Sequence, residues 1–124
     1  MPWSYSQATG NLSLDGNFVV TGYSGNGAGL NNPAMQNVHN VGPLPHGTYT
    51  IGPAYDDNNH PGKGPVVMPL EPDPANEMFG RDGFLIHGDT AARDHTASDG
   101  CIILDIPYRD QIAASPDRVL IVTA

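Results

Sequence analysis

Apolar residues occur along this chain in short runs separated by turn residues, a pattern that is typical of strands rather than helices. Residues 3–7 alternate aromatic with polar side chains, and residues 11–14 alternate again. The Asp15-Gly16 pair that follows predicts a two-residue hairpin turn, with the next apolar run as the return strand. We therefore expect residues 3–23 to form a small antiparallel meander.

The remaining apolar runs predict more strands and one helix. The strands are expected at residues 48–51, 66–70, 84–86, 102–104 and 118–123. The second of these should be stopped by Pro69 and Pro72, because proline interrupts a hydrogen-bonded ladder. Pro107, with Asp105 just ahead of it, predicts a short helix over residues 107–114. Residues 1–124 are therefore interpreted as a single mainly β domain, a compact sandwich or barrel with one short helix and long loops.

Residues 22–40 differ from the rest because glycine and asparagine dominate them. Two interpretations stay open for this segment, namely a long surface loop and a rim of a functional site. No lysine follows the glycines, which argues against a phosphate-binding loop. Within the segment, residues 34–38 predict a single helical turn.

The amino-acid composition narrows the classes of function that this chain can have. The chain has 124 residues, 15 glycines, 12 prolines and a net charge of −8 with only five Lys and Arg. So few basic residues give no dense basic patch, and we expect neither nucleic-acid binding nor insertion into a membrane. No apolar run approaches transmembrane length, and no signal peptide is visible at the N-terminus. The single cysteine excludes an internal disulfide.

That cysteine lies in the stretch that carries the candidate chemistry, residues 83–104. His87 ends the first apolar run of this stretch, and Gly100-Cys101 precedes the second. A histidine and a cysteine at the ends of neighbouring strands can face each other, and an imidazole can take the proton of a thiol, whose thiolate is the nucleophile. The alternative is a buried structural cysteine together with a histidine held by backbone hydrogen bonds.

The other histidines, at positions 39, 46, 60 and 95, lie in expected loops. His95 is the strongest rival to His87, because it lies between the two strands of the central stretch. A zinc site built from His87, His95 and Cys101 matches no common ligand spacing. We therefore expect no metal and no cofactor.

The order His-Gly, short loop, Ser-x-Gly-Cys, apolar strand resembles the L,D-transpeptidases, cysteine enzymes that remodel bacterial peptidoglycan. The upstream G-P-L-P-H-G-T-Y-T-I resembles a strand motif of that family. The Y-S-G-N-G and N-N-P-x-M-Q segments, with S-D-G-C, look like one branch of it, the antibacterial type VI secretion effectors. The resemblance runs from about residue 18 to residue 122. The His-then-Cys order also differs from that of papain-like proteases.

The resemblance implies an L,D-transpeptidase-like β fold and a role for each matching residue. Cys101 would be the nucleophile and His87 the base that generates its thiolate. The carbonyl of Gly88, or the side chain of Asp89, would orient the imidazole. The N–H groups of Gly100 and Cys101 would stabilise the oxyanion.

Further residues of the motif region complete the expected site. Ser98 matches the family's Ser or Thr and would shape the turn. Asp99 stands where housekeeping members carry histidine, and because a carboxylate disfavours a neighbouring thiolate, a nearby cation is expected. The candidates to supply this positive charge, or to hold the carboxylate of the substrate, are Arg81, Arg93 and Arg109. The candidate substrate contacts are Tyr23, Asn32, Asp89 and Arg93.

The implied activity is cleavage of the meso-diaminopimelate–D-alanine bond of tetrapeptide stems through an acyl-enzyme, followed by hydrolysis or by exchange with a D-amino acid. The implied setting is a toxin secreted without a cleaved signal peptide that acts in the periplasm of a target bacterium. An immunity protein and a component of the secretion machine would be its partners. Two alternatives stay open: a non-catalytic cell-wall-binding module with an inert cysteine, and a sortase-like cysteine peptidase.

Overall fold

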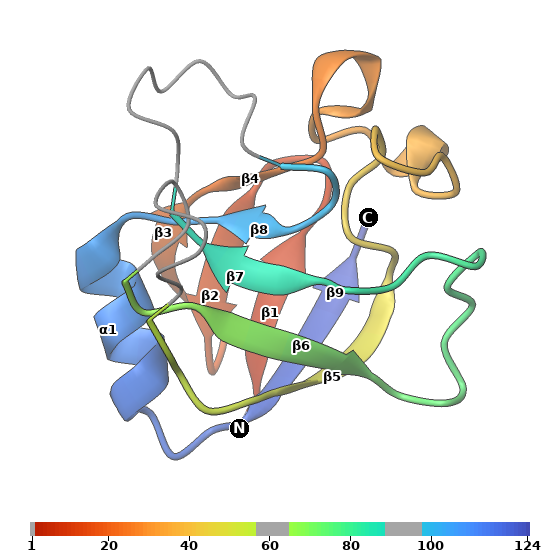
Figure 1. Cartoon of the computed structure of the whole chain (residues 1–124). Coiled ribbons are helices and arrows are strands. Elements are labelled where there is room, and N and C mark those ends of the chain that lie inside the picture. Colours follow the sequence, from red (N-terminus) through yellow and green to blue (C-terminus); the bar gives the residue numbers. More distant parts are fainter. Residues whose placement is uncertain (1, 57–64, 89–97) are drawn as a thin grey trace.

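The computed structural model describes residues 2–56, 65–88 and 98–124. Within these residues, nine strands form one mixed sheet in the order β3-β2-β1-β9-β5-β6-β7-β8-β4 (Figure 1). The strands are β1 (Trp3–Ser6), β2 (Asn11–Leu14), β3 (Asn17–Thr21), β4 (Tyr23–Ser24), β5 (Gly47–Ile51), β6 (Met68–Pro72), β7 (Leu85–His87), β8 (Ile102–Ile103) and β9 (Val119–Thr123). The two ends of this order, β3 and β4, are separated in the chain by Gly22 alone, so the sheet curves into a nearly closed barrel.

The predicted N-terminal meander is confirmed. Strand β2 pairs antiparallel with β1 and with β3, and the register sets Leu14 opposite Asn17 across the hairpin. The two turn residues, Asp15 and Gly16, both have positive φ, at 54° and 81°. A type I′ turn requires this conformation at both central positions, and Asp-Gly is among the pairs that adopt it readily.

Of the two prolines expected to stop the strand near residue 70, Pro72 does end it, whereas the expectation for Pro69 is wrong. Strand β6 begins at Met68 and contains both Pro69 and Pro72. Pro69 is tolerated because the ladder uses its carbonyl, which accepts a hydrogen bond from the Gly52 N–H at 2.8 Å. Pro72 is the last residue of the strand, where the loss of an N–H costs little.

The core fills the inside of the curved sheet. Alternate residues of the long strands point inward, as in β9, where Leu120 and Val122 are buried while Val119 and Ile121 are exposed. The core cluster comprises Trp3, Tyr5, Leu12, Leu44, Tyr49, Ile51, Met68, Leu70, Phe84, Ile86, Ile102, Leu104, Ile112, Leu120 and Val122. These observations confirm the mainly β fold class.

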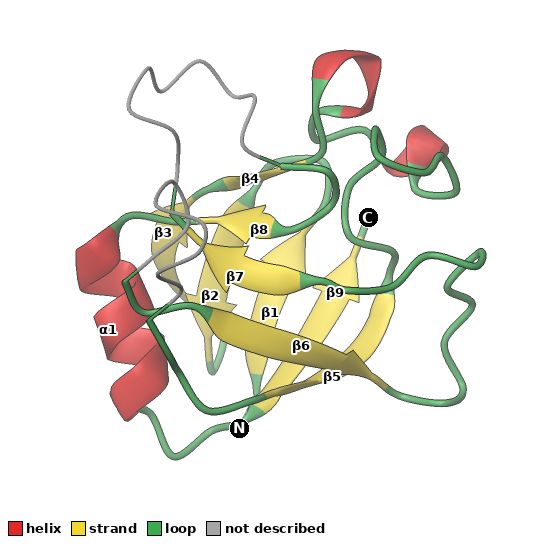
Figure 2. Cartoon of the chain, in the orientation of Figure 1, coloured by secondary structure: helices red, strands yellow, loops and turns green. Residues whose placement is uncertain are grey.

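Helix α1 (Ile106–Ala114) lies against the side of the sheet (Figure 2) and confirms the predicted helix. Its Ile112 is buried in the core, and its Arg109 is buried as well. The 22–40 segment contains β4 and two 3₁₀ turns, η1 (Gly27–Gly29) and η2 (Pro33–Met35), so the expected helical turn begins one residue early. Among the described residues, no helix has the length and apolarity that crossing a membrane requires.

Candidate active site

Strands β7 and β8 bring the candidate base and nucleophile together. They pair in parallel with Ile86 opposite Ile102, so continuing the register back by one residue sets Leu85 beside Cys101. The Leu85 N–H donates to Cys101 Sγ at 3.3 Å, which agrees with this placement. Residues two apart on a strand share a face. His87 and Cys101 therefore lie on the same side of adjacent strands, opposite the core side to which Ile86 and Ile102 belong.

His87 is held in one ring orientation. Its side chain is buried, and its Nδ1 lies 2.8 Å from the Gly88 carbonyl oxygen. A carbonyl only accepts, so Nδ1 must carry the proton, and Nε2 is then the basic nitrogen. Gly88 also leaves room for α1, because a Cβ there would lie 2.8 Å from Nη2 of Arg109. Asp89, the alternative orienting residue, lies outside the described residues, as do Arg93 and His95.

The turn before β8, residues 98–101, is fixed by side-chain donors. Each of its four backbone carbonyls accepts from a side chain: Ser98 from Asn26 at 2.8 Å, Asp99 from Arg81 at 3.0 Å, Gly100 from Ser24 at 2.9 Å and Cys101 from Ser98 at 2.6 Å. Three of the four donors come from distant segments, around β4 and before β7. The peptide planes that carry the thiol are therefore held before any ligand arrives.

Ser98 is the centre of this turn. It is fully buried, and its hydroxyl accepts from the Gly25 N–H at 2.9 Å and from the Gly100 N–H at 3.0 Å. The Gly100 N–H, one of the two expected oxyanion donors, is thus bonded to Ser98 in this structure. Gly100 has a φ of +132°, and a Cβ on it would lie 2.5 Å from both Arg81 Nη2 and the Phe84 ring.

Arg81 is the candidate cation that the structure sets against the cysteine turn. Its side chain is 6% exposed, and its guanidinium lies 5.1 Å from the centroid of the Phe84 ring. Burial lowers the pKa of Arg81, and the electrostatic attraction of Tyr49, Cys101 and Asp99 opposes that shift. The Asp99 carboxylate itself is exposed and lies 3.3 Å from the Asn26 side-chain amide.

Arg109, another candidate cation, lies behind Gly88 rather than beside Cys101. Its guanidinium donates to the carbonyls of Pro65 and Val66. Burial lowers the pKa of Arg109, and the nearby Asp105 and Asp110 oppose the shift.

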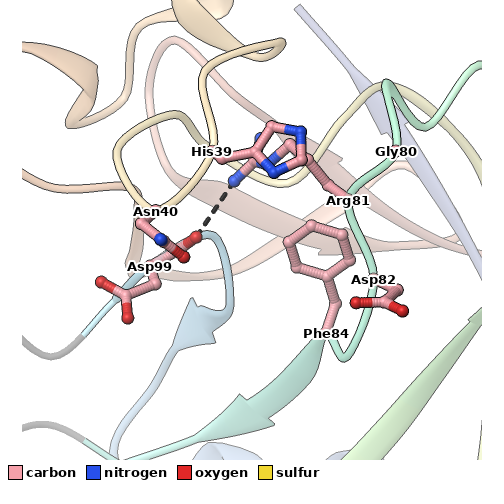
Figure 3. Close-up of a pocket in the computed structure, with 7 residues that line it drawn as sticks. All are labelled: His39, Asn40, Gly80, Arg81, Asp82, Phe84 and Asp99. Atoms are coloured by element: carbon pink, nitrogen blue, oxygen red, sulfur yellow. Dashed lines mark hydrogen bonds between the residues drawn. The ribbon is translucent and has the colours of Figure 1, made fainter.

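A cavity of about 90 Å³ opens beside the turn on its Asp99 side (Figure 3). Its lining residues are His39, Asn40, Gly80, Arg81, Asp82, Phe84 and Asp99. The sequence interpretation included Asp99 and Arg81 but missed the other five. Of these five, the sequence pointed only to His39 and Asn40 as possible site residues, because they end the Gly- and Asn-rich segment that was interpreted as a surface loop or a rim of a functional site.

The two expected substrate contacts from that segment lie in different places. Tyr23 is buried on β4 opposite Ile103, which in turn pairs with His87, so all three lie in one row across the sheet. Asn32 instead caps η2 by accepting from the Ala34 N–H at 3.2 Å. The described residues contain no group of three or more His, Cys, Asp or Glu side chains arranged to hold a metal ion.

Fold and site together define a small β domain with a histidine and a cysteine on adjacent parallel strands. The sequence matches the family model of the Tlde1 domain over residues 19–115. This match spans most of the chain, which therefore belongs to the Tlde1 domain family. Members of this family are type VI secretion effectors that act on peptidoglycan. Comparison with curated proteins finds no significant match.

Among solved structures, the helical cell shape determining protein Pgp2 from Campylobacter jejuni is similar, with a TM-score of 0.60 at 15% sequence identity. The alignment covers 97% of this chain and 46% of that protein. This chain thus spans about half the length of Pgp2, and at such low identity the likeness concerns the fold alone.

Proposed function

We propose that this domain is an antibacterial effector that acts on peptidoglycan tetrapeptide stems as a cysteine L,D-carboxypeptidase and L,D-transpeptidase. The observation that carries the proposal is the placement of His87 and Cys101 on one face of adjacent parallel strands. The Nδ1 bond to Gly88 and the four side-chain donors of the 98–101 turn add support, because both fix the geometry in advance.

In the proposed reaction, Nε2 of His87 takes the proton of Cys101 Sγ, and the thiolate attacks the carbonyl carbon of meso-diaminopimelate. A carbon–sulfur bond forms, and the carbonyl oxygen becomes an oxyanion that the Cys101 N–H stabilises. The Gly100 N–H also stabilises the oxyanion if it gives up its bond to Ser98 Oγ and donates to the oxyanion instead. The carbon–nitrogen bond then breaks, and D-alanine leaves with the proton from His87.

The resulting thioester has two fates. Attack by water gives a tripeptide stem, which is carboxypeptidase action, whereas attack by the amine of a D-amino acid gives an exchanged stem. In both cases the nucleophile loses a proton to His87, and the thiol is regenerated. Which fate dominates depends on which nucleophile reaches the acyl-enzyme first.

The family supports the biological setting that we propose. Delivery by a type VI secretion machine would bring the domain to the periplasm of a target bacterium, where its substrate lies. A producing cell would need an immunity protein that blocks the site. Both partners follow from the effector role and not from any surface of the described residues.

The proposal is tested by mass spectrometry of muropeptides from tetrapeptide-rich sacculi, with and without added D-methionine. We expect the wild-type protein to remove the terminal D-alanine or to replace it with D-methionine, and we expect Cys101→Ala and His87→Ala to do neither. His46→Ala is the matched control and should act like the wild type, because His46 is an exposed histidine that bonds to Gln36. Tetrapeptides left intact by the wild-type protein would overturn the proposal.

A further inference from the structure

We propose that Arg81 is a positioning residue for Cys101, which holds the turn that carries the thiol and supplies the positive charge that stabilises the thiolate. The inference rests on the proposed thiol chemistry and extends it to a residue outside the His-Gly and Ser-x-Gly-Cys motifs. Its basis is the set of contacts that the guanidinium makes.

The Arg81 guanidinium joins the cysteine turn to a separate part of the chain. It donates to the carbonyls of Gln36, Pro43 and Gly42, and Nη2 also donates to the Asp99 carbonyl at 3.0 Å (Figure 3). A planar guanidinium with several fixed donors suits this task, and a lysine ammonium does not reproduce it. Loss of Arg81 therefore leaves the Asp99 carbonyl without this donor, and the peptide plane between Asp99 and Gly100 is then held by the bond from the Gly100 N–H to Ser98.

The packing leaves no space between this guanidinium and the residue before the nucleophile. Even a Cβ on Gly100 would lie 2.5 Å from Arg81 Nη2, and the ring of Phe84 covers the guanidinium from another side. The positive charge thus lies against the backbone of Gly100, on a side chain that is itself almost fully buried. Charges interact more strongly in such surroundings than in bulk solvent.

Within the described residues, the four carbonyl oxygens that accept hydrogen bonds from Arg81 carry no net charge. Burial lowers the pKa of Arg81, and the electrostatic attraction of Tyr49, Cys101 and Asp99 opposes that shift. Since the attraction is mutual, the same charge favours the thiolate of Cys101. On this proposal, the charge of Arg81 offsets the carboxylate of Asp99, which stands where the sequence resemblance expects a histidine in housekeeping L,D-transpeptidases.

Other ionisable groups of the described residues lie in the segments around the cysteine turn. His87 ends β7, which pairs with β8, and Asp99 lies in the turn itself, while His39 and Asp82 line the cavity beside Arg81. The two carboxylates disfavour a thiolate, because like charges repel. Among these groups, Arg81 is the one that stays positively charged over the pH range of the assay.

The test measures the pH dependence of alkylation of Cys101 by iodoacetamide, followed by intact mass. Cys101 is the only cysteine of the chain and is partly exposed, so the label reports on this site alone. We expect Arg81→Met to raise the pH midpoint of alkylation by about one unit and to slow alkylation about tenfold below it. An unchanged midpoint in folded Arg81→Met would overturn the proposal.

Arg118→Met is the matched control. Among the described residues, the Arg118 guanidinium also donates to four carbonyls, those of Ile51, Gly52, Ile112 and Ser115, near the C-terminal end of α1. Its loss removes a comparable set of bonds without touching the cysteine turn. We expect the alkylation midpoint of Arg118→Met to equal that of the wild type, and an equal rise in both variants would overturn a specific role for Arg81.

Arg81→Lys keeps the inference testable if Arg81→Met fails to fold. The lysine retains the charge but cannot hold four carbonyls, so we expect a midpoint near that of the wild type and a D-alanine release rate at least tenfold lower. Wild-type values for both quantities would overturn the proposal.

Alkylation requires no peptidoglycan, which separates the two proposals. An Arg81-dependent midpoint in a protein that leaves muropeptides intact would refute the proposed function and leave the role of Arg81 standing. Muropeptide cleavage with a midpoint that is independent of Arg81 would refute the role of Arg81 alone.

Discussion

Replacing Ser98 with alanine measures how firmly the cysteine turn is held. The mutation removes three hydrogen bonds at once, from the Gly25 and Gly100 N–H groups and to the Cys101 carbonyl. Gly25 and Gly100 are buried, so two donors lose their partner where water does not replace it. Each buried group without a partner costs about 1–3 kcal/mol, which gives an expected loss of about 3 kcal/mol in the free energy of unfolding.

A loss of this size is a large part of the total stability of a small domain, about 5–15 kcal/mol, and should lower Tm by roughly 10 °C. Urea unfolding can be followed by the fluorescence of Trp3, the only tryptophan, which is fully buried. Ser115→Ala is the control, because the Ser115 hydroxyl accepts a single bond, from the Asp117 N–H at 3.1 Å, and should cost less than about 1 kcal/mol. If Ser98→Ala cost no more than Ser115→Ala, the argument for a fixed turn would fail.

Two further predictions concern the barrel. Gly22→Ala should destabilise the protein by about 1–3 kcal/mol in urea unfolding, because its Cβ would lie 2.3 Å from the Ile103 carbonyl oxygen; a loss below ~0.5 kcal/mol would contradict this. Burial raises the pKa of the Tyr5 phenol well above its usual value. The unfolded chain therefore ionises first, and stability present below about pH 10 is lost as pH rises through the folded-state pKa. The Tyr5 hydroxyl has no hydrogen-bond partner among the described residues, so Tyr5→Phe should preserve neutral stability and raise the alkaline unfolding midpoint, whereas an unchanged midpoint would refute the assignment.

Local sequence patterns predicted the parts of the fold that depend on residues close together in the chain. The Asp15-Gly16 turn follows from the positive φ that both positions require. For β9 the pattern predicted the strand but not its inward positions, because residues 119–122 are all apolar. The pairing of the strand that ends in His87 with the strand that follows Cys101 agrees with their places at the ends of two apolar runs. The roles of the two residues stay a prediction until the muropeptide assay is done.

Contacts between distant segments could not be predicted in this way. Nothing in the local pattern around residue 81 shows that Arg81 lies against Gly100, because the contact depends on how the loop before β7 packs on residues 36–43. The prediction for Pro69 was wrong for a related reason. Whether a strand tolerates a proline depends on whether the neighbouring strand bonds to the carbonyl of that residue or needs its missing N–H. Both facts are properties of the assembled sheet rather than of either segment alone.

The glycines of the 22–40 segment explain how those distant parts are held together. A Cβ on Gly25 would lie 2.4 Å from the Gly29 carbonyl oxygen, and one on Gly29 would lie 2.1 Å from that of Val41. The next residue, Gly42, gives its carbonyl to Arg81 at 2.9 Å. Backbone thus packs directly on backbone from β4 to the acceptors of the guanidinium, and any side chain in between would push them apart. The segment for which the sequence left open a surface loop or a rim of a functional site is, on this packing, part of the support of the cysteine turn.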